Sequence, residues 1–233
     1  MKIGGLQKTS AIDYPGQLTA ILFTQGCNLK CPYCHNPELI SIKSDSPEFD
    51  KEKFFSFLEK RKNILDAVTI TGGEPTLQKD LIPFIKKIKE MNYLIKLDSN
   101  GLKPKILNKL INHNLLDYLA VDIKLPAESY SKLDAQMDLA KIKNNLQATI
   151  EIIEKAELDY EFRTTVVTGF HSKSSFERTV KQIKGSQNYY IQNFRPHKTL
   201  NKSFEKKRRF TEKELNEFKE IAKKYVKNVY IRD

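Results

Sequence analysis

The sequence predicts an α/β fold in which parallel strands alternate with helices. Six short segments rich in β-branched and aromatic residues alternate with stretches whose apolar residues recur every three or four positions. Such alternation implies parallel strands joined by right-handed crossovers. The length of 233 residues suits one large domain. These patterns leave open whether the sheet is an open, doubly wound one or a closed or partial barrel.

The predicted strands are distributed evenly along the chain. They are Thr19–Phe23, Ala67–Thr71, Leu94–Asp98, Tyr118–Lys124, Tyr160–Val167 and Tyr189–Phe194. Helical spacing of apolar residues is clearest over 81–88, 139–153 and 215–225. Two helix starts carry the residue pair of a capping box, Ser174 with Glu177 and Thr211 with Glu214.

We expect a single domain over residues 1–233. Its core would span about 17–197, after an N-terminal extension over 1–16. Residues 198–233 would add a basic loop, a helix and a candidate edge strand at Val229–Ile231. No segment rich in Pro, Gly or Ser is long enough to divide the chain.

Composition and charge exclude several classes of protein. Hydrophobic residues make up 39% and charged residues 30% of the chain, so neither a disordered nor a fibrous protein is expected. No apolar run approaches the roughly 18 residues of a membrane helix, and the N-terminus lacks the apolar region of a secretory signal. We therefore expect a cytoplasmic protein without a membrane partner. The net charge of +11 suits a solvated lysine-rich surface or an acidic macromolecular partner.

The three cysteines, Cys27, Cys31 and Cys34, follow the first predicted strand. An odd number without a distant partner argues against a disulfide framework. Three thiolates spaced C-x3-C-x2-C can ligate three irons of a 4Fe-4S cluster and leave the fourth without a protein ligand. An open metal position can bind a substrate or cofactor. The alternative is a structural Cys3His zinc site that uses His35, although the usual second C-x2-C knuckle is absent from the sequence.

Polar or glycine-rich segments also follow the later predicted strands. They are Gly72-Gly73-Glu74-Pro75, Asp98-Ser99-Asn100-Gly101, Asp122-Ile123-Lys124, Thr168-Gly169 and Arg195-Pro196-His197. Because parallel strands of a barrel present their carboxyl ends on one rim, where active sites form, we predict one shared site. Asp122 and Lys124 share a strand face, so a structural ion pair is an alternative for them. An ordinary turn is the alternative for the two glycines.

The cysteine motif, with an aromatic residue before its last cysteine, resembles that of the radical S-adenosylmethionine (SAM) enzymes. Two further motifs resemble the activating enzymes of glycyl radical enzymes, in particular those of anaerobic ribonucleoside-triphosphate reductase. One is the run over residues 4–16 that leads into Gln25-Gly26-Cys27, and the other is Cys34-His35-Asn36-Pro37-Glu38-Leu39. The resemblance covers roughly residues 3–197 and implies a partial (β/α)6 TIM-like barrel.

The resemblance also implies a role for each matched position. Cys27, Cys31 and Cys34 would ligate a 4Fe-4S cluster. Contacts to SAM would come from Tyr33, Gly72, Gly73, Glu74, Asp98, Asn100, Asp122, Lys124 and His197. Asp98 and Asp122 would also be candidates to bind a monovalent cation. No catalytic residue is expected beyond these cluster and cofactor ligands.

The function implied by the resemblance is that of a radical SAM oxidoreductase. It would cleave SAM reductively to methionine and a 5′-deoxyadenosyl radical, which would take a hydrogen from a glycine of a partner, expected to be anaerobic ribonucleoside-triphosphate reductase. A flavodoxin- or ferredoxin-like protein would donate the electron. Nucleic acid is not expected as a partner, because no RNA-binding module is present. The alternatives are a radical SAM enzyme acting on a small molecule or nucleobase, in deazapurine or tRNA modification, and a non-catalytic zinc-binding interaction protein.

Overall fold

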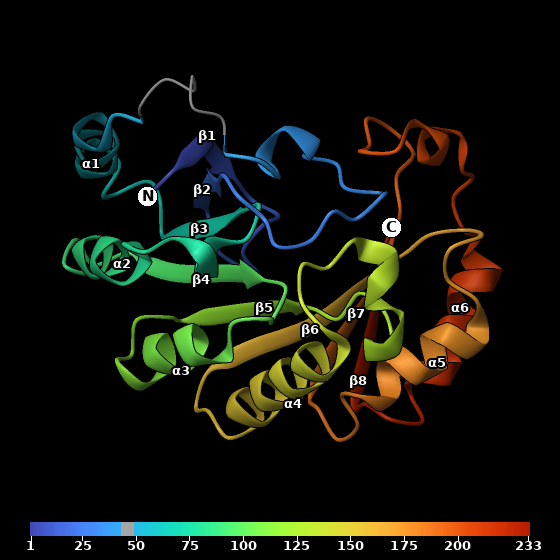
Figure 1. Cartoon of the computed structure of the whole chain (residues 1–233). Helices are drawn as coiled ribbons and strands as arrows, with labels where there is room; N and C mark the ends of the chain where they lie inside the picture. The colour runs from blue at the N-terminus through green and yellow to red at the C-terminus, as the bar shows by residue number, and fades with distance from the viewer. Residues whose placement is uncertain (43–48) are drawn as a thin grey trace.

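The computed structural model describes residues 1–42 and 49–233 and contains one eight-stranded sheet (Figure 1). Strand order follows sequence order, from β1 to β8. β1 (Ile3–Ser10) pairs antiparallel with β2 (Thr19–Thr24), and all later neighbours pair in parallel. The remaining strands are β3 (Ala67–Gly72), β4 (Leu94–Ser99), β5 (Tyr118–Asp122), β6 (Asp159–Val166), β7 (Asn188–Asn193) and β8 (Asn228–Arg232).

The α-helices connect the parallel strands and lie around the outside of the curved sheet (Figure 1). They are α1 (Lys51–Lys60), α2 (Leu81–Lys89), α3 (Pro104–Asn112), α4 (Leu139–Glu154), α5 (Lys173–Lys181) and α6 (Glu212–Ala222). Short 3-10 turns lie at η1 (Pro37–Leu39), η2 (Pro75–Leu77), η3 (Ala127–Leu133) and η4 (Lys202–Lys206). The strand–helix units from β2 to α6 confirm the predicted α/β fold with a partial barrel. Within the described part of the chain, no helix combines the length and apolarity needed to cross a bilayer.

The strands separate an apolar outer face from a polar inner face. On β6, Tyr160 and Phe162 share one face, with ring centroids 5.5 Å apart, and Glu161 and Arg163 lie on the other. On β7, Tyr189 packs against Phe176 of α5. The helices therefore cover the apolar face, whereas the inner face is left with charged side chains at its centre.

The structure corrects two local predictions and confirms two others. The strand β1 was not predicted, because residues 1–16 were expected to form only an extension. The capping box predicted for Ser174 and Glu177 is wrong, since Ser172 and Ser175 form the box of α5. The box of Thr211 with Glu214 at α6 is confirmed, as is the edge strand, which is β8.

Glu161 of β6 anchors the last strand from the inner face. Its fully buried carboxylate accepts two hydrogen bonds from the guanidinium of Arg232 on β8, at 2.6 and 2.7 Å. The hydroxyl of Tyr118 on β5 donates a third, at 2.8 Å. Arg232 also lies over the ring of Tyr190 on β7, 3.7 Å from its centroid. One buried carboxylate therefore ties β5, β6 and β8 together.

Replacing Arg232 should measure this contribution. Arg232→Met leaves the buried carboxylate with the hydrogen bond from Tyr118 and the charge of Arg163 at 3.8 Å, so we expect a loss of about 2 kcal/mol in the free energy of unfolding. Arg178→Met is the matched control, because the ion pair of Arg178 with Glu128 is exposed on both sides and should contribute under about 1 kcal/mol. Urea unfolding compares the two variants. Equal losses of unfolding free energy in the two variants would show that the ion pair of Arg232 with Glu161 stabilises the protein no more than an exposed ion pair does.

Candidate active site

A cavity of about 410 Å³ lies at the carboxyl ends of the parallel strands. This volume falls within the range of small-molecule binding sites. All but one of the site residues predicted from the sequence line this cavity. The residues that line it are Cys27, Cys31, Tyr33, Cys34, Gly72, Gly73, Glu74, Asp98, Asn100, Asp122 and Lys124. The structure therefore brings together residues from four separate strand ends, as predicted. The exception is His197.

The segment over residues 25–40, here called the cysteine loop, is held by main-chain hydrogen bonds. The amides of Gly26 and Cys27 donate to the carbonyls of residues 39 and 40, at 2.8 and 2.9 Å. The basic loop contacts it from the other side, since the amides of Leu200 and Asn201 donate to the carbonyls of Cys34 and Pro32, at 3.1 and 2.9 Å. The C-terminal segment therefore helps to fix the cysteine loop, a role that its sequence did not indicate.

All three cysteines are free thiols in a desolvated environment. Burial, with the charge of Glu74, raises the pKa of Cys27 to about 12, and burial raises the pKa of Cys31 to about 11. The thiols must therefore release protons when they ligate a metal. In residues 1–42 and 49–233, no three His, Cys, Asp or Glu side chains are arranged to hold one metal ion. A 4Fe-4S cluster does not require such convergence, because each cysteine ligates a different iron.

Two glycines at the end of β3 allow the main chain to approach the cysteine loop. A Cβ on Gly73 would lie 2.3 Å from the carbonyl oxygen of Gly26, and one on Gly72 would lie 2.3 Å from the amide nitrogen of Thr24. Gly72 also has a φ of +112°, which only glycine adopts readily. The amide of Glu74 donates to the same Gly26 carbonyl at 2.8 Å. Gly72 and Gly73 therefore line the cavity with main-chain atoms.

The side chain of Glu74 is fully buried and bound by its own chain. Its Oε1 accepts hydrogen bonds from the hydroxyls of Thr76 and Ser99, at 2.5 and 2.9 Å, and from the Thr76 amide at 3.1 Å. Its Oε2 accepts from the amide of Asn100 at 2.7 Å. Burial raises the pKa of Glu74, although these bonds partly oppose that shift. The carboxylate thus links the end of β3 to the end of β4.

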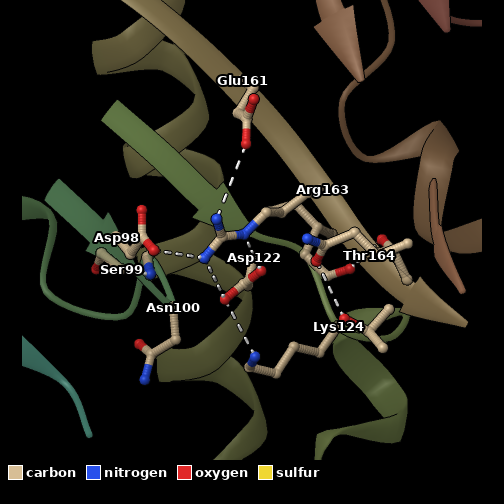
Figure 2. Close-up of polar contacts among 12 residues, drawn as sticks. Asp98, Ser99, Asn100, Asp122, Lys124, Glu161, Arg163 and Thr164 are labelled. Atoms are coloured by element: carbon tan, nitrogen blue, oxygen red, sulfur yellow. Dashed lines mark hydrogen bonds and ion pairs between the residues drawn. The ribbon is translucent and has the colours of Figure 1, made fainter. Parts of the chain in front are cut away.

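Asp98, Asp122, Lys124 and Arg163 form an ion-pair cluster on the inner face (Figure 2). Arg163 bridges the two aspartates, with Nε 2.6 Å from Asp122 Oδ1 and Nη2 3.1 Å from Asp98 Oδ2. Lys124 lies 3.3 Å from Asp122 Oδ2. Burial alone would raise the pKa of Asp122, but the charges of Arg163 and Lys124 hold it well below its usual value.

Arg163 was not among the predicted site residues. The available signal was its sequence context, a lone arginine on the predicted strand Tyr160–Val167. A buried charge of this kind requires partners. Its closest carboxylate partners, Asp98 and Asp122, lie on β4 and β5 and so could not be identified from local sequence.

His197 is placed outside the cavity, at its rim. Its exposed ring stacks on that of His35, with centroids 4.2 Å apart. The Nε2 of His35 is 2.9 Å from the carbonyl oxygen of Arg195. Both histidines line an adjoining cavity of about 710 Å³. The pair therefore lies where the two cavities meet.

Comparison with known proteins shows the family to which the chain belongs. The model of the radical SAM superfamily matches residues 21–183. The chain belongs to the radical SAM superfamily. Members of this superfamily use a 4Fe-4S cluster and SAM, so the zinc-binding, non-catalytic alternative is wrong and the chain is a radical SAM enzyme.

Two relatives refine this assignment, and a solved structure shares the fold. The chain is 36% identical over 232 residues to a glycyl-radical enzyme activating enzyme of Methanocaldococcus jannaschii, covering 99% of this chain and 95% of that protein. It is 40% identical over 87 residues to a pyruvate formate-lyase-activating enzyme of Staphylococcus aureus, covering 36% of this chain and 33% of that protein. A radical SAM methyltransferase from Sphaerobacter thermophilus shares the fold, with a TM-score of 0.68 and 16% identity over 94% of this chain and 68% of its own. Within the superfamily, the chain belongs to the activating enzymes of glycyl radical enzymes.

A buried histidine holds the main chain of Lys124 at this site. The Nδ1 of His171 accepts a hydrogen bond from the Val167 amide, and its Nε2–H donates to the carbonyl of Lys124, both at 3.0 Å. The first bond needs the neutral ring, because Nδ1 accepts a hydrogen bond only when it carries no proton. Burial lowers the pKa of His171 to about 4.

The stability of the protein should therefore depend on pH through His171. Between pH 6.5 and 4 the unfolded chain binds a proton that the folded chain excludes, so stability falls as pH falls, by on the order of 3 kcal/mol. His171→Gln should flatten this slope in urea unfolding between pH 4.5 and 7.5. His113→Gln, on an exposed residue, is the matched control. An unchanged slope in His171→Gln would assign the pH dependence to other groups.

Proposed function

We propose that this protein cleaves SAM reductively and generates a glycyl radical on a partner enzyme, which is anaerobic ribonucleoside-triphosphate reductase. The observation that carries the proposal is the similarity to an activating enzyme over 99% of the chain, with three free cysteines lining one cavity. The long N-terminal motifs support this partner over other glycyl radical enzymes. The expected electron donor is a flavodoxin- or ferredoxin-like protein, and the expected location is the cytoplasm.

The residues of the cavity fit the two cofactors. Cys27, Cys31 and Cys34 would each ligate one iron of the cluster, which leaves one iron without a protein ligand. Asn28, beside Cys27, has a buried Nδ2 for which the described chain supplies no acceptor. A bound group could use this donor. When bound, the cluster and SAM supply the electron transfer and the cleavage of the carbon–sulfur bond.

Other residues of the chain would bind and orient SAM. Lys124 presents an ammonium group to the cavity, held by Asp122, and would bind the carboxylate of SAM. Gly72 and Gly73 would contact SAM through their main-chain groups. The carboxylate of Glu74 already accepts hydrogen bonds from Thr76 and Asn100 of the protein itself. Asp98, Asn100 and His197 remain predicted contacts.

The side chain of Tyr33 would exclude water beneath the cofactors. Its buried ring lies 5.4 Å from that of Phe170 and 6.4 Å from that of Phe194, centroid to centroid. The ring of Phe204 completes this aromatic layer under the cysteine loop. Exclusion of water would protect a reactive radical from side reactions.

The glycine-bearing loop of the partner would enter through the adjoining cavity. That cavity shares Asp13, His35 and Arg163 with the cavity of the cysteines, so the two adjoin. Ile12, at its edge, is 90% exposed. A protein loop could therefore reach SAM from the side opposite the helices.

Electron paramagnetic resonance tests the function directly. Anaerobically reconstituted protein, SAM, a reductant and anaerobic ribonucleoside-triphosphate reductase should give a glycyl radical doublet on the reductase. Cys31→Ala should abolish both the radical and SAM cleavage, because one iron loses its ligand, while circular dichroism shows the fold retained. SAM cleavage without a glycyl radical would favour the alternative of a small-molecule or nucleobase substrate. Full activity of Cys31→Ala would contradict the assigned ligand.

A further inference from the structure

We propose that the guanidinium of Arg163 is the resident cation between Asp98 and Asp122, so that these aspartates bind no monovalent metal ion while it is in place. The sequence resemblance implied such an ion at these two carboxylates, and the residues present do not fit it. This inference rests on the proposed function in one respect, which is that SAM binds in the cavity of the cysteines.

The guanidinium uses all three of its nitrogens on carboxylates (Figure 2). Nε and Nη2 lie 2.6 and 3.4 Å from the two oxygens of Asp122. Nη2 also lies 3.1 Å from Asp98 Oδ2, and Nη1 lies 3.8 Å from Glu161 Oε1. Arg163 thus occupies the position between the aspartates that a metal ion would need.

The register of the sheet explains how one side chain spans three strands. Asp122 on β5 pairs with Arg163 on β6, and Asp98 on β4 pairs with Ala120 on β5. Ala120 and Asp122 share the inner face of β5, since they are two residues apart. The small side chain of Ala120 therefore leaves room for the arginine to cross β5 and reach Asp98.

The charges of the aspartates are already compensated without a metal. Lys96 lies 2.5 Å from Asp98, and Lys124 lies 3.3 Å from Asp122, in addition to Arg163. The side chains of Asp98, Asp122 and Arg163 are only 14, 20 and 13% exposed, so water screens these charges weakly. A further cation would enter a group that holds three positive charges and would have to displace one of their hydrogen bonds.

Ion-specific stabilisation tests the proposal without measuring SAM cleavage. The anaerobically prepared, cluster-bearing protein is melted in NaCl, KCl or choline chloride at equal ionic strength, and ²³Na line widths are recorded. The wild type should melt at the same temperature in all three salts and should not broaden the sodium signal. Arg163→Ala should melt about 3 °C higher in NaCl or KCl than in choline chloride, with a saturable dependence on the metal ion.

A second variant keeps the test decisive. Arg163→Lys retains a charge near the aspartates and should be as indifferent to the salt as the wild type. A saturable, ion-specific shift in the wild type would overturn the proposal even if Arg163→Ala does not fold. A folded Arg163→Ala without any ion response would also overturn it. Because no turnover is measured, failure of the proposed function would leave these outcomes unchanged.

Discussion

The site depends on one close contact between two stretches of main chain. The carbonyl of Gly26 in the cysteine loop accepts a hydrogen bond from the amide of Glu74, and Gly73 lies so near that a Cβ would collide with it. This contact sets the distance between the three thiols and the ends of β3 and β4. The carboxylate of Glu74 extends the same link to Asn100. The glycines therefore serve the packing of the site itself, in addition to any contact with a cofactor.

Charge compensation is the second constraint on the inner face. Strands of a partial barrel that carry Glu161, Asp98 and Asp122 on one face bury carboxylates, which is unfavourable unless each has a partner. Arg232 and Arg163 supply those partners from β8 and β6. Both arginines connect neighbouring strands, and Arg163 also lines the cavity of the cysteines. The ion pairs that stabilise the sheet thus include residues that line the cavity, namely Asp98, Asp122, Lys124 and Arg163.

The sequence was sufficient to predict the strands β2 to β7, because their apolar runs are buried and bounded by polar turns. It was also sufficient to group the cysteines with the strand-end residues. β1 was missed because only Ile3 and Ser10 of its eight residues are buried, so no periodic pattern marks it. Arg163 was missed because its closest carboxylate partners, Asp98 and Asp122, are distant in sequence. The placement of His197 at the rim depends on its stacking with His35, which no local pattern records.

Three cysteine ligands would leave one iron of a 4Fe-4S cluster open for SAM. Mössbauer spectroscopy of the ⁵⁷Fe-reconstituted protein can detect this open position, because it distinguishes the individual irons. Addition of SAM should change the isomer shift of one iron of the four and leave the others unchanged. Four irons that do not respond to saturating SAM would show that the fourth position is closed, and the account of this site would then be wrong.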